Sequence, residues 1–345
     1  MKTDSTSIPI AIASDNNNKL QLMVVICSIL KNKASDSRLR FYLLITDDFD
    51  QQVINALESM FVQFDVQYYS FIKMGNKYEN SKIFTKHLST PAFYRLSLSE
   101  FLQENKCIYL DTDVIVLCDL CELFGQIDSD YLLSGVKSAC FYWPLDSLET
   151  RAKYLKVDKF DKYINSGVLV MNLNLMRKQN SVQKYNDLLS YNFKNEDQDI
   201  LNSACYDYIK IIPPKYNSMT KYWNDNFNNY YSDCFPYLKY CYSESEWKEA
   251  CEDPVIIHYA DKEKPWNTMG VAYFRLWWQY LKEVDKFYPC YDELYAQFID
   301  DQINKVRNDN ALLNNFKLEL ERIKNSRSYK LAQIIAKFAK PFKSR

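Results

Sequence analysis

The stretch "IPIAIASDNNNKLQLMVVICSILKN" (residues 8–32) contains the local pattern on which the fold depends. Its first six residues form a short apolar run typical of a buried strand, "SDNNN" predicts a turn, and "LQLMVVICSILKN" has the spacing of a helix. The pattern repeats, with strands expected at 39–45 and 64–70 and a helix at 51–61. This alternation predicts a parallel sheet covered by helices, with ligands bound at the carboxyl ends of its strands.

Size and composition restrict the class of protein. The chain has 345 residues, of which 47% are hydrophobic and 16% aromatic, enough for a sizeable core. Its 43 basic and 44 acidic residues leave a net charge of −1, so we expect no nucleic-acid partner. The first residues do not resemble a signal peptide, and no apolar run is long enough to cross a membrane. We therefore expect a cytoplasmic protein with reduced cysteines.

Two carboxylates, Asp111 and Asp113, follow the apolar run "CIYL" (107–110). If strand geometry continues, both side chains project from the same side. Carboxylates this close repel each other unless a cation lies between them, and oxygen ligands suit Mg²⁺ or Mn²⁺ bound to phosphate. The motif therefore predicts a divalent metal and a phosphorylated ligand. Its alternatives are two surface acids in a turn, or the nucleophile-bearing strand of an aspartyl phosphotransferase, which should be the first strand of its domain.

Other polar residues also follow predicted strands. His258 ends the apolar "PVIIH" and is a candidate metal ligand or a hydrogen-bonded structural histidine. Lys264, six residues later, is suited to pair with a phosphate. The glycine motifs of dinucleotide and P-loop sites are missing from the sequence, so metal and lysine would have to meet the phosphate charge. Gly167, in "YINSGVLVMNL", would permit a close approach of backbone to ligand.

The later part of the chain is less regular. The segment "NEDQDILN" (195–202) carries acids near a helix start, where they either complement the helix dipole or belong to a site. Residues 216–250 are rich in aromatic side chains and asparagine without a clear period. This composition is compatible with irregular structure around a site, with a partner surface or with core.

The end of the chain is helical by pattern and then basic. Residues 271–323 repeat apolar side chains at three-, four- and seven-residue steps. The last 22 residues carry no acid, and their basic residues are Lys324, Arg327, Lys330, Lys337, Lys340, Lys343 and Arg345. An apolar stripe of Leu331, Ile334, Ile335 and Phe338 predicts a basic amphipathic helix on an anionic membrane surface. The alternative is a helix packed on the main domain with a solvated basic face.

Six segments stand in an order and spacing that resembles glycosyltransferase family eight, in particular bacterial lipopolysaccharide galactosyl- and glucosyltransferases. They are "IAIASDNNN", "TPAFYRLSL", "IYLDTDVIV", "YINSGVLVMNL", "NEDQDILN" and "IIHYADKEKPW". The resemblance implies a GT-A-type α/β fold over residues 1–270, with a Rossmann-like mixed sheet flanked by helices. It also implies a helical extension over 271–345 that ends in the membrane-associating tail.

The resemblance further implies Mn²⁺ or Mg²⁺, a UDP-glucose or UDP-galactose donor, and transfer with retention at the anomeric carbon. Asp111, Asp113 and His258 resemble the family's metal ligands, and His87 lies in its flexible donor-covering segment. The other residues carried over are the uridine contacts Ala13, Asp15 and Asn17, the diphosphate contact Lys264, and the donor-sugar shell Arg95, Asn165, Ser166, Asp197 and Gln198. Of these, Arg95, Asp197 and Gln198 are the catalytic candidates, and Asp111 also belongs to the donor site.

Two positions depart from the family pattern. Asp261 stands where the family often has a glycine near the diphosphate. Galactosyl members commonly have an aspartate in the donor pocket, and the nearest corresponding position in this sequence is Ala139.

We expect a retaining hexosyltransferase on the inner face of the cytoplasmic membrane, acting on a lipid-linked glycan of lipopolysaccharide, lipooligosaccharide or capsule. A protein- or self-glycosylating relative and a non-catalytic nucleotide- or carbohydrate-binding protein are the alternatives.

Overall fold

The computed structural model describes residues 7–79, 81, 90–142, 144–191, 193–222 and 238–325. The chain divides into two compact units, Met1–Pro289 and Cys290–Arg345. The expected donor-covering segment around His87 and the basic tail from 326 onward lie outside the described residues.

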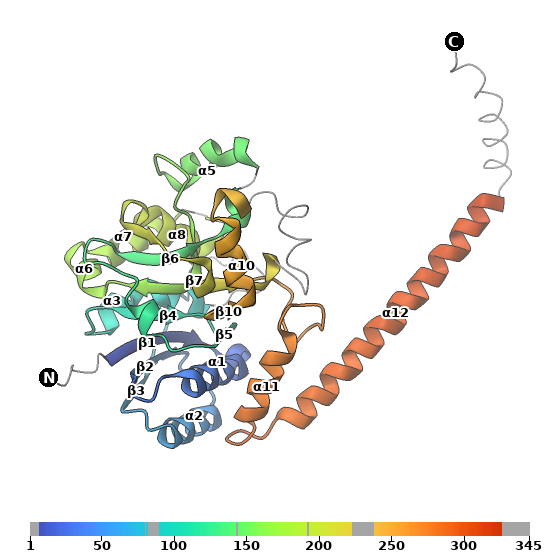
Figure 1. Ribbon diagram of the computed structural model, residues 1–345, viewed down its shortest axis with the longest axis horizontal. Helices are drawn as coiled ribbons and strands as arrows, with labels where there is room; N and C mark the ends of the chain where they lie inside the picture. The colour runs from blue at the N-terminus through green and yellow to red at the C-terminus, as the bar shows by residue number, and fades with distance from the viewer. Residues whose placement is uncertain are drawn as a thin grey trace, which may run out of the picture. The chain divides into compact units, whose positions relative to one another are not determined.

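A seven-stranded sheet forms the centre of the first unit, in the order β3-β2-β1-β4-β7-β6-β8 (Figure 1). Its strands are β1 (Ser7–Ser14), β2 (Arg38–Ile45), β3 (Tyr68–Lys73), β4 (Cys107–Leu110), β6 (Leu133–Lys137), β7 (Ile164–Met171) and β8 (Ile209–Ile211). The first four are parallel, whereas β7 runs antiparallel to both β4 and β6. The predicted parallel arrangement therefore holds for the first half, and the complete sheet is mixed.

Most helices of the first unit are short, and the two longest follow the first two strands. In the first unit they are α1 (Lys19–Asn32), α2 (Gln51–Gln63), α3 (Leu98–Phe101), α4 (Cys121–Phe124), α5 (Leu148–Leu155), α6 (Leu173–Lys178), α7 (Ser181–Leu188), α8 (Glu196–Ala204), α10 (Glu244–Glu252) and α11 (Phe274–Val284). Three 3₁₀ segments matter for the site, namely η1 (Asn16–Asn18), η2 (Thr90–Ser97) and η6 (Pro214–Asn217). Helix α11 packs against α1 and belongs to the first unit, although it follows residue 270.

Local sequence explains where the first elements begin and end. The Asp50 carboxylate accepts the backbone N–H of Gln52 and caps α2. After α2 the chain turns through Asp65, whose φ of 50° is in the left-handed region. The third strand consequently begins at Tyr68, a few residues later than the range 64–70 expected from the apolar pattern.

A second, three-stranded sheet lies beside the first and contains β5 (Val114–Val116), β10 (Ile256–His258) and β9 (Ser218–Met219). β10 is antiparallel to β5, with His258 opposite Val114, and parallel to β9. Only residues 111–113 separate β4 in the large sheet from β5 in the small one. This turn therefore lies where the two sheets meet.

The described part of the second unit contains one long helix, α12 (Tyr291–Asn325). Its presence agrees with the helical periodicity of residues 271–323. Among the described residues, no helix combines the length and apolar character needed to cross a bilayer.

Candidate functional site

Asp111 and Asp113 lie in the turn that leads from β4 to β5. β4 ends before Asp111 and β5 begins after Asp113 in the other sheet, so the strand does not continue through the acids as the sequence suggested. The Asp111 N–H donates to the carbonyl oxygen of Gly167 at 2.8 Å and holds the turn against β7. One ligand atom from each of Asp111, Asp113 and His258 lies within 4.8 Å of the others.

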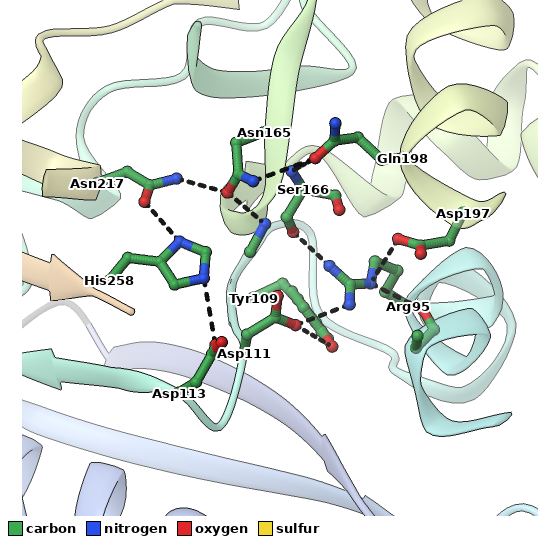
Figure 2. Close-up of polar contacts among 12 residues, drawn as sticks. Arg95, Tyr109, Asp111, Asp113, Asn165, Ser166, Asp197, Gln198, Asn217 and His258 are labelled. Carbon is green, nitrogen blue, oxygen red and sulfur yellow. Dashed lines mark hydrogen bonds and ion pairs between the residues drawn. The ribbon is translucent and has the colours of Figure 1, made fainter. Parts of the chain in front are cut away.

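His258 is the last residue of β10 and is 2% exposed. Its Nδ1 lies 2.8 Å from Oδ1 of Asn217, and its Nε2 lies 3.2 Å from Oδ1 of Asp113 (Figure 2). The pairing of β10 with β5 brings the histidine to this position, because its partner Val114 directly follows Asp113.

The donor atoms of this cluster fit a divalent metal. Oδ1 of Asp113 is buried and accepts no hydrogen bond from any residue in the described ranges, although Nε2 of His258 is close. A buried carboxylate oxygen without a partner is unfavourable, and a cation bound there would satisfy it. Two carboxylates and one imidazole are ligands suited to Mn²⁺ and neighbouring divalent ions. These three residues are the ones that could hold a metal.

Lys264 adds a positive charge beside the cluster. Its Nζ donates to Oδ2 of Asp113 at 2.6 Å and to the carbonyl oxygen of Tyr259. Burial would raise the pKa of Asp113, but the positive charge of Lys264 opposes this effect, and the pKa lies well below its usual range. Asp113 is therefore ionised, and the lysine is fixed where it could meet an anionic ligand.

Arg95, in η2, links the acids across the site and is 3% exposed. Nη2 donates to Oδ1 of Asp111 at 2.7 Å, Nη1 to the carbonyl oxygen of Ser166 at 2.5 Å, and Nε to that of Ala92 at 2.8 Å. Burial lowers the pKa of Arg95, but Asp111 and Asp197 together raise it above its ordinary value. The guanidinium therefore remains charged and orients the carboxylate of Asp111.

Asp197 is a second buried acid, 2% exposed, at the start of α8. Burial raises the pKa of Asp197 to about 6, and nearby Arg95 opposes the increase. Its Oδ2 lies 3.2 Å from Nε of Arg95 but receives no hydrogen bond within the described part of the chain, since that N–H is directed to Ala92. The preceding Glu196 has a left-handed φ of 36°, a strained conformation for a residue with a Cβ.

Gln198 lies against the beginning of β7. Its Oε1 accepts hydrogen bonds from Nδ2 of Asn165 and the N–H of Ser166, each at 3.1 Å (Figure 2). Its Nε2 donates to the Tyr163 hydroxyl at 2.9 Å, and this hydroxyl donates to Oδ1 of Asp199 at 2.5 Å. The amide is therefore fixed with its oxygen toward β7.

Gly167 is close to the metal-ligand side chains. A Cβ added at this residue would lie 2.3 Å from Cε1 of His258 and 2.7 Å from Oδ2 of Asp111. Both distances are far below van der Waals contact. The Gly167 backbone therefore approaches side chains of the site closely, while its expected approach to a ligand stays a prediction.

The proposed uridine contacts lie at the end of the neighbouring strand. Parallel pairing puts Ile12 of β1 level with Leu110 of β4, so the residues after β1 share the sheet edge that carries Asp111. Asp15 accepts the N–H groups of Asn17 and Asn18 at 3.1 and 3.2 Å and caps η1. Ala13 is within β1, 7% exposed. These contacts explain the local conformation, while the ligand role of the three residues remains a prediction.

The two departures from the family pattern have different surroundings. Asp261 is exposed, and its carboxylate accepts the N–H of Lys262 at 2.7 Å. Ala139 is fully buried in a 3₁₀ turn.

Sequence reasoning missed Asn217, which lies in η6 and is fully buried. It falls in the aromatic-rich region 216–250, whose described part contains buried side chains such as Tyr216, Tyr222 and Trp247. Asn217 has no motif around it, because its role depends on contacts with Asn165 and His258, which lie far away in the sequence.

Comparison with known proteins gives a consistent assignment. The sequence model of glycosyl transferase family 8 matches residues 9–270. General stress protein A of Bacillus subtilis (strain 168) is 26% identical over 273 residues, covering 75% of this chain and 87% of that protein. A lipopolysaccharide 1,2-glucosyltransferase of Escherichia coli is 28% identical over 280 residues, covering 76% of this chain and 75% of that protein.

A solved structure shares the fold. The galactosyltransferase LgtC, in complex with donor and acceptor sugar analogs, aligns with a TM-score of 0.66 at 19% identity, covering 80% of this chain and 96% of that chain. This likeness confirms the expected GT-A-type α/β fold. Together with the family match over most of the first unit, it leads to one conclusion. The chain belongs to glycosyltransferase family 8 and is a glycosyltransferase enzyme.

Proposed function

We propose that this enzyme is a retaining hexosyltransferase that transfers glucose or galactose from a UDP-sugar to a lipid-linked glycan, with Mn²⁺ as its metal and Mg²⁺ as a substitute. The observation that carries the proposal is the buried, unpaired Oδ1 of Asp113 among Asp111, His258 and Lys264. Charge builds on a diphosphate as it leaves a sugar, and a cation with a lysine beside it is suited to stabilise that charge.

The residues of the metal side have separate tasks in this proposal. Asp111, Asp113 and His258 would hold the ion, which would supply Lewis-acid chemistry at the diphosphate. Lys264 contributes its charge to the same diphosphate. Arg95 keeps Asp111 in place through the 2.7 Å bond and is itself kept charged by the acids around it.

On the other side of the site, Asp197 and Gln198 belong beside the donor sugar, with Asn165 and Ser166 supporting them. Oε1 of Gln198 already accepts two hydrogen bonds, which supports a role in orienting the sugar and argues against attack by this oxygen. We propose front-face transfer, in which the leaving group departs and the acceptor attacks on one face of the sugar. Positive charge that develops on the sugar ring is favoured by the nearby carboxylate of Asp197.

The donor base and the acceptor are assigned from the family resemblance. Ala13, Asp15 and Asn17 are proposed to contact uridine. The likeness to a lipopolysaccharide glucosyltransferase supports a lipopolysaccharide, lipooligosaccharide or capsule acceptor. Attachment of the basic tail to the inner surface of the cytoplasmic membrane would bring the enzyme to such a lipid-linked substrate. The proposed domain limits remain 1–270 for the catalytic domain and 271–345 for the extension.

A donor screen tests the proposal. The purified chain is given UDP-glucose, UDP-galactose and other UDP-sugars, with Mn²⁺ or with a chelator, and UDP release is measured. We expect metal-dependent release from one hexose donor, and loss of that release in Asp113→Ala. Gln198→Ala should bind UDP with normal affinity but should cleave the UDP-sugar donor slowly.

Four results would contradict parts of the proposal. Equal release with chelator would exclude a required metal, and an undiminished rate in Gln198→Ala would exclude its role beside the sugar. Labelled sugar appearing on protein, with none on a lipid extract, would favour a protein- or self-glycosylating enzyme. Failure to bind UDP in calorimetry would reject the donor assignment itself.

A further inference from the structure

A continuous chain of side-chain amides joins the two halves of the site. Starting from Gln198, it passes through Asn165 and Asn217 and ends at the imidazole of His258 (Figure 2). These residues come from α8, β7, η6 and β10, so four separate elements meet in one hydrogen-bonded line. Asn217 is the one link that touches the ring of a proposed metal ligand.

Backbone N–H groups determine which way each amide points. The N–H of Gly167 donates to Oδ1 of Asn165 at 3.0 Å, which identifies this atom as the oxygen. Nδ2 of Asn217 donates to the same oxygen at 2.9 Å. The remaining polar atom of Asn217 is then its Oδ1, and this acceptor faces Nδ1 of His258 at 2.8 Å.

This orientation determines the tautomer of the neutral histidine. An amide oxygen has only lone pairs, so Nδ1 must carry the proton that bonds to it. Nε2 then carries a lone pair, which faces the unpaired Oδ1 of Asp113 at 3.2 Å. Two lone pairs directed at each other are an arrangement that a cation stabilises.

The neighbours of Asn217 hold its backbone in place. The hydroxyl of Tyr216 donates to the carboxylate of Glu122, and the Ser218 hydroxyl donates to the carbonyl oxygen of Ala250 at 2.7 Å. Ser218 also pairs with Ile257 in the parallel β9–β10 ladder, directly beside His258. The amide is fully buried, so no water competes for its hydrogen bonds.

We propose that Asn217 is a positioning residue that fixes the Nδ1–H tautomer of His258 and thereby presents Nε2 to a divalent cation. The inference rests on the metal site of the proposed function. It goes beyond that site because the same amide chain also sets the orientation of Gln198, through Nδ2 of Asn165 and the N–H of Ser166. The metal-binding side and the sugar-binding side thus share one set of hydrogen bonds.

Ring nitrogen NMR on the metal-free chain tests the proposal directly. The chain has two histidines, so labelling with ¹⁵N-histidine gives two pairs of ring-nitrogen signals, and His87→Gln identifies the pair from His258. Spectra are recorded over a series of pH values, and the tautomer is read where the ring shifts no longer change as the pH is raised further. We expect protonated Nδ1 and bare Nε2 for His258. In Asn217→Ala the proton should move to Nε2, because Asp113 becomes the remaining acceptor.

Two further variants separate this effect from general damage. Asn217→Asp keeps an oxygen opposite Nδ1 and should keep the tautomer, even though it loses the donor to Asn165. Asn172→Ala removes another hydrogen-bonded asparagine, at the opposite end of β7, where the side chain caps α6. It should leave the His258 signals unchanged. An Asn217→Ala protein with its native melting cooperativity and an unchanged tautomer would overturn the proposal.

Calorimetric titration with Mn²⁺ alone completes the test. Removal of a partner that orients a metal-binding histidine lowers affinity by about 10- to 100-fold, and we expect a loss in that range for Asn217→Ala. A tautomer change without weaker binding would contradict the presentation of Nε2 to the metal. No Mn²⁺ binding by the unmodified chain, with the tautomer change still present, would reject the proposed metal site and uphold the orientation of His258 by Asn217.

Discussion

Replacement of Gly167 by alanine should remove metal binding through a single methyl group. The new Cβ would lie 2.3 Å from Cε1 of His258, 3.0 Å from its Nε2, and 2.7 Å from Oδ2 of Asp111. Ordinary carbon contacts begin at about 3.5 Å, so the ring must retreat by roughly 1 Å. The neighbours resist such a shift, because Asn217 holds the ring and Arg95 holds the carboxylate.

The size of the effect follows from the geometry. Metal sites tolerate ligand displacements of about 0.2 Å, so a shift of roughly 1 Å takes His258 out of coordination. We expect Mn²⁺ affinity to fall by about 100-fold or more, beyond the range for a lost orienting partner. Overpacking should also lower the free energy of unfolding by about 1–3 kcal/mol without metal.

The assay is Mn²⁺ calorimetry together with thermal unfolding of the metal-free protein. Gly270→Ala is the matched control, because among the described residues its added Cβ would meet only Thr268 Oγ1, at an ordinary 3.5 Å. Unchanged Mn²⁺ affinity in Gly167→Ala would refute the reasoning. It would mean that the ligands can move aside, or that the metal binds elsewhere.

Three other changes have distinct outcomes. The pKa of Asp197 is raised from about 3.9 to about 6 on folding, so the stability it contributes is complete below pH 4 and is lost as pH rises through 6. That amounts to about 3 kcal/mol. The free energy of unfolding, measured in urea, should therefore fall between pH 4 and 6 in the unmodified protein but not in Asp197→Asn. The same fall in both proteins would exclude Asp197 as its source. Arg95→Met leaves buried acids uncompensated and should lower the free energy of unfolding by about 3–5 kcal/mol in urea titration, whereas Lys153→Met, in an exposed pair with Glu149, should change it by less than about 1 kcal/mol. Deletion of residues 324–345 should abolish sedimentation with anionic vesicles while UDP-sugar hydrolysis continues, and vesicle binding by the shortened chain would contradict a role of the tail in attachment.

The first half of the fold could be predicted because its signals are local. Contiguous apolar runs separated by polar turns define β1, α1, β2 and α2, and each run is buried as its pattern indicates. The start of β3 was placed too early, because an apolar count does not register the left-handed turn at Asp65. The reversal of β7 could not be read from its own residues, since a fully buried strand looks the same in either direction.

The site shows the same division between local and distant causes. Asp111 and Asp113 were recognisable as a pair, but the chain turns there because β5 finds its partner in β10, far along the sequence. Hydrogen bonds in the structure link most of the residues carried over by resemblance. Asn217 and Tyr163 were overlooked because a hydrogen-bonding partner leaves no periodic pattern.

The distance along the chain between the two acids and His258 also has a consequence for biosynthesis. When the turn at 111–113 leaves the ribosome, β10 has not been made, and an ion would find two carboxylates without the imidazole or Lys264. Pairing of β5 with β10 must close a long loop before the cluster exists. The complete cluster of Asp111, Asp113 and His258 therefore forms only after this pairing. A divalent ion bound to the cluster, as proposed above, would therefore stabilise the folded protein by mass action and would not act on the earlier, partly made chain.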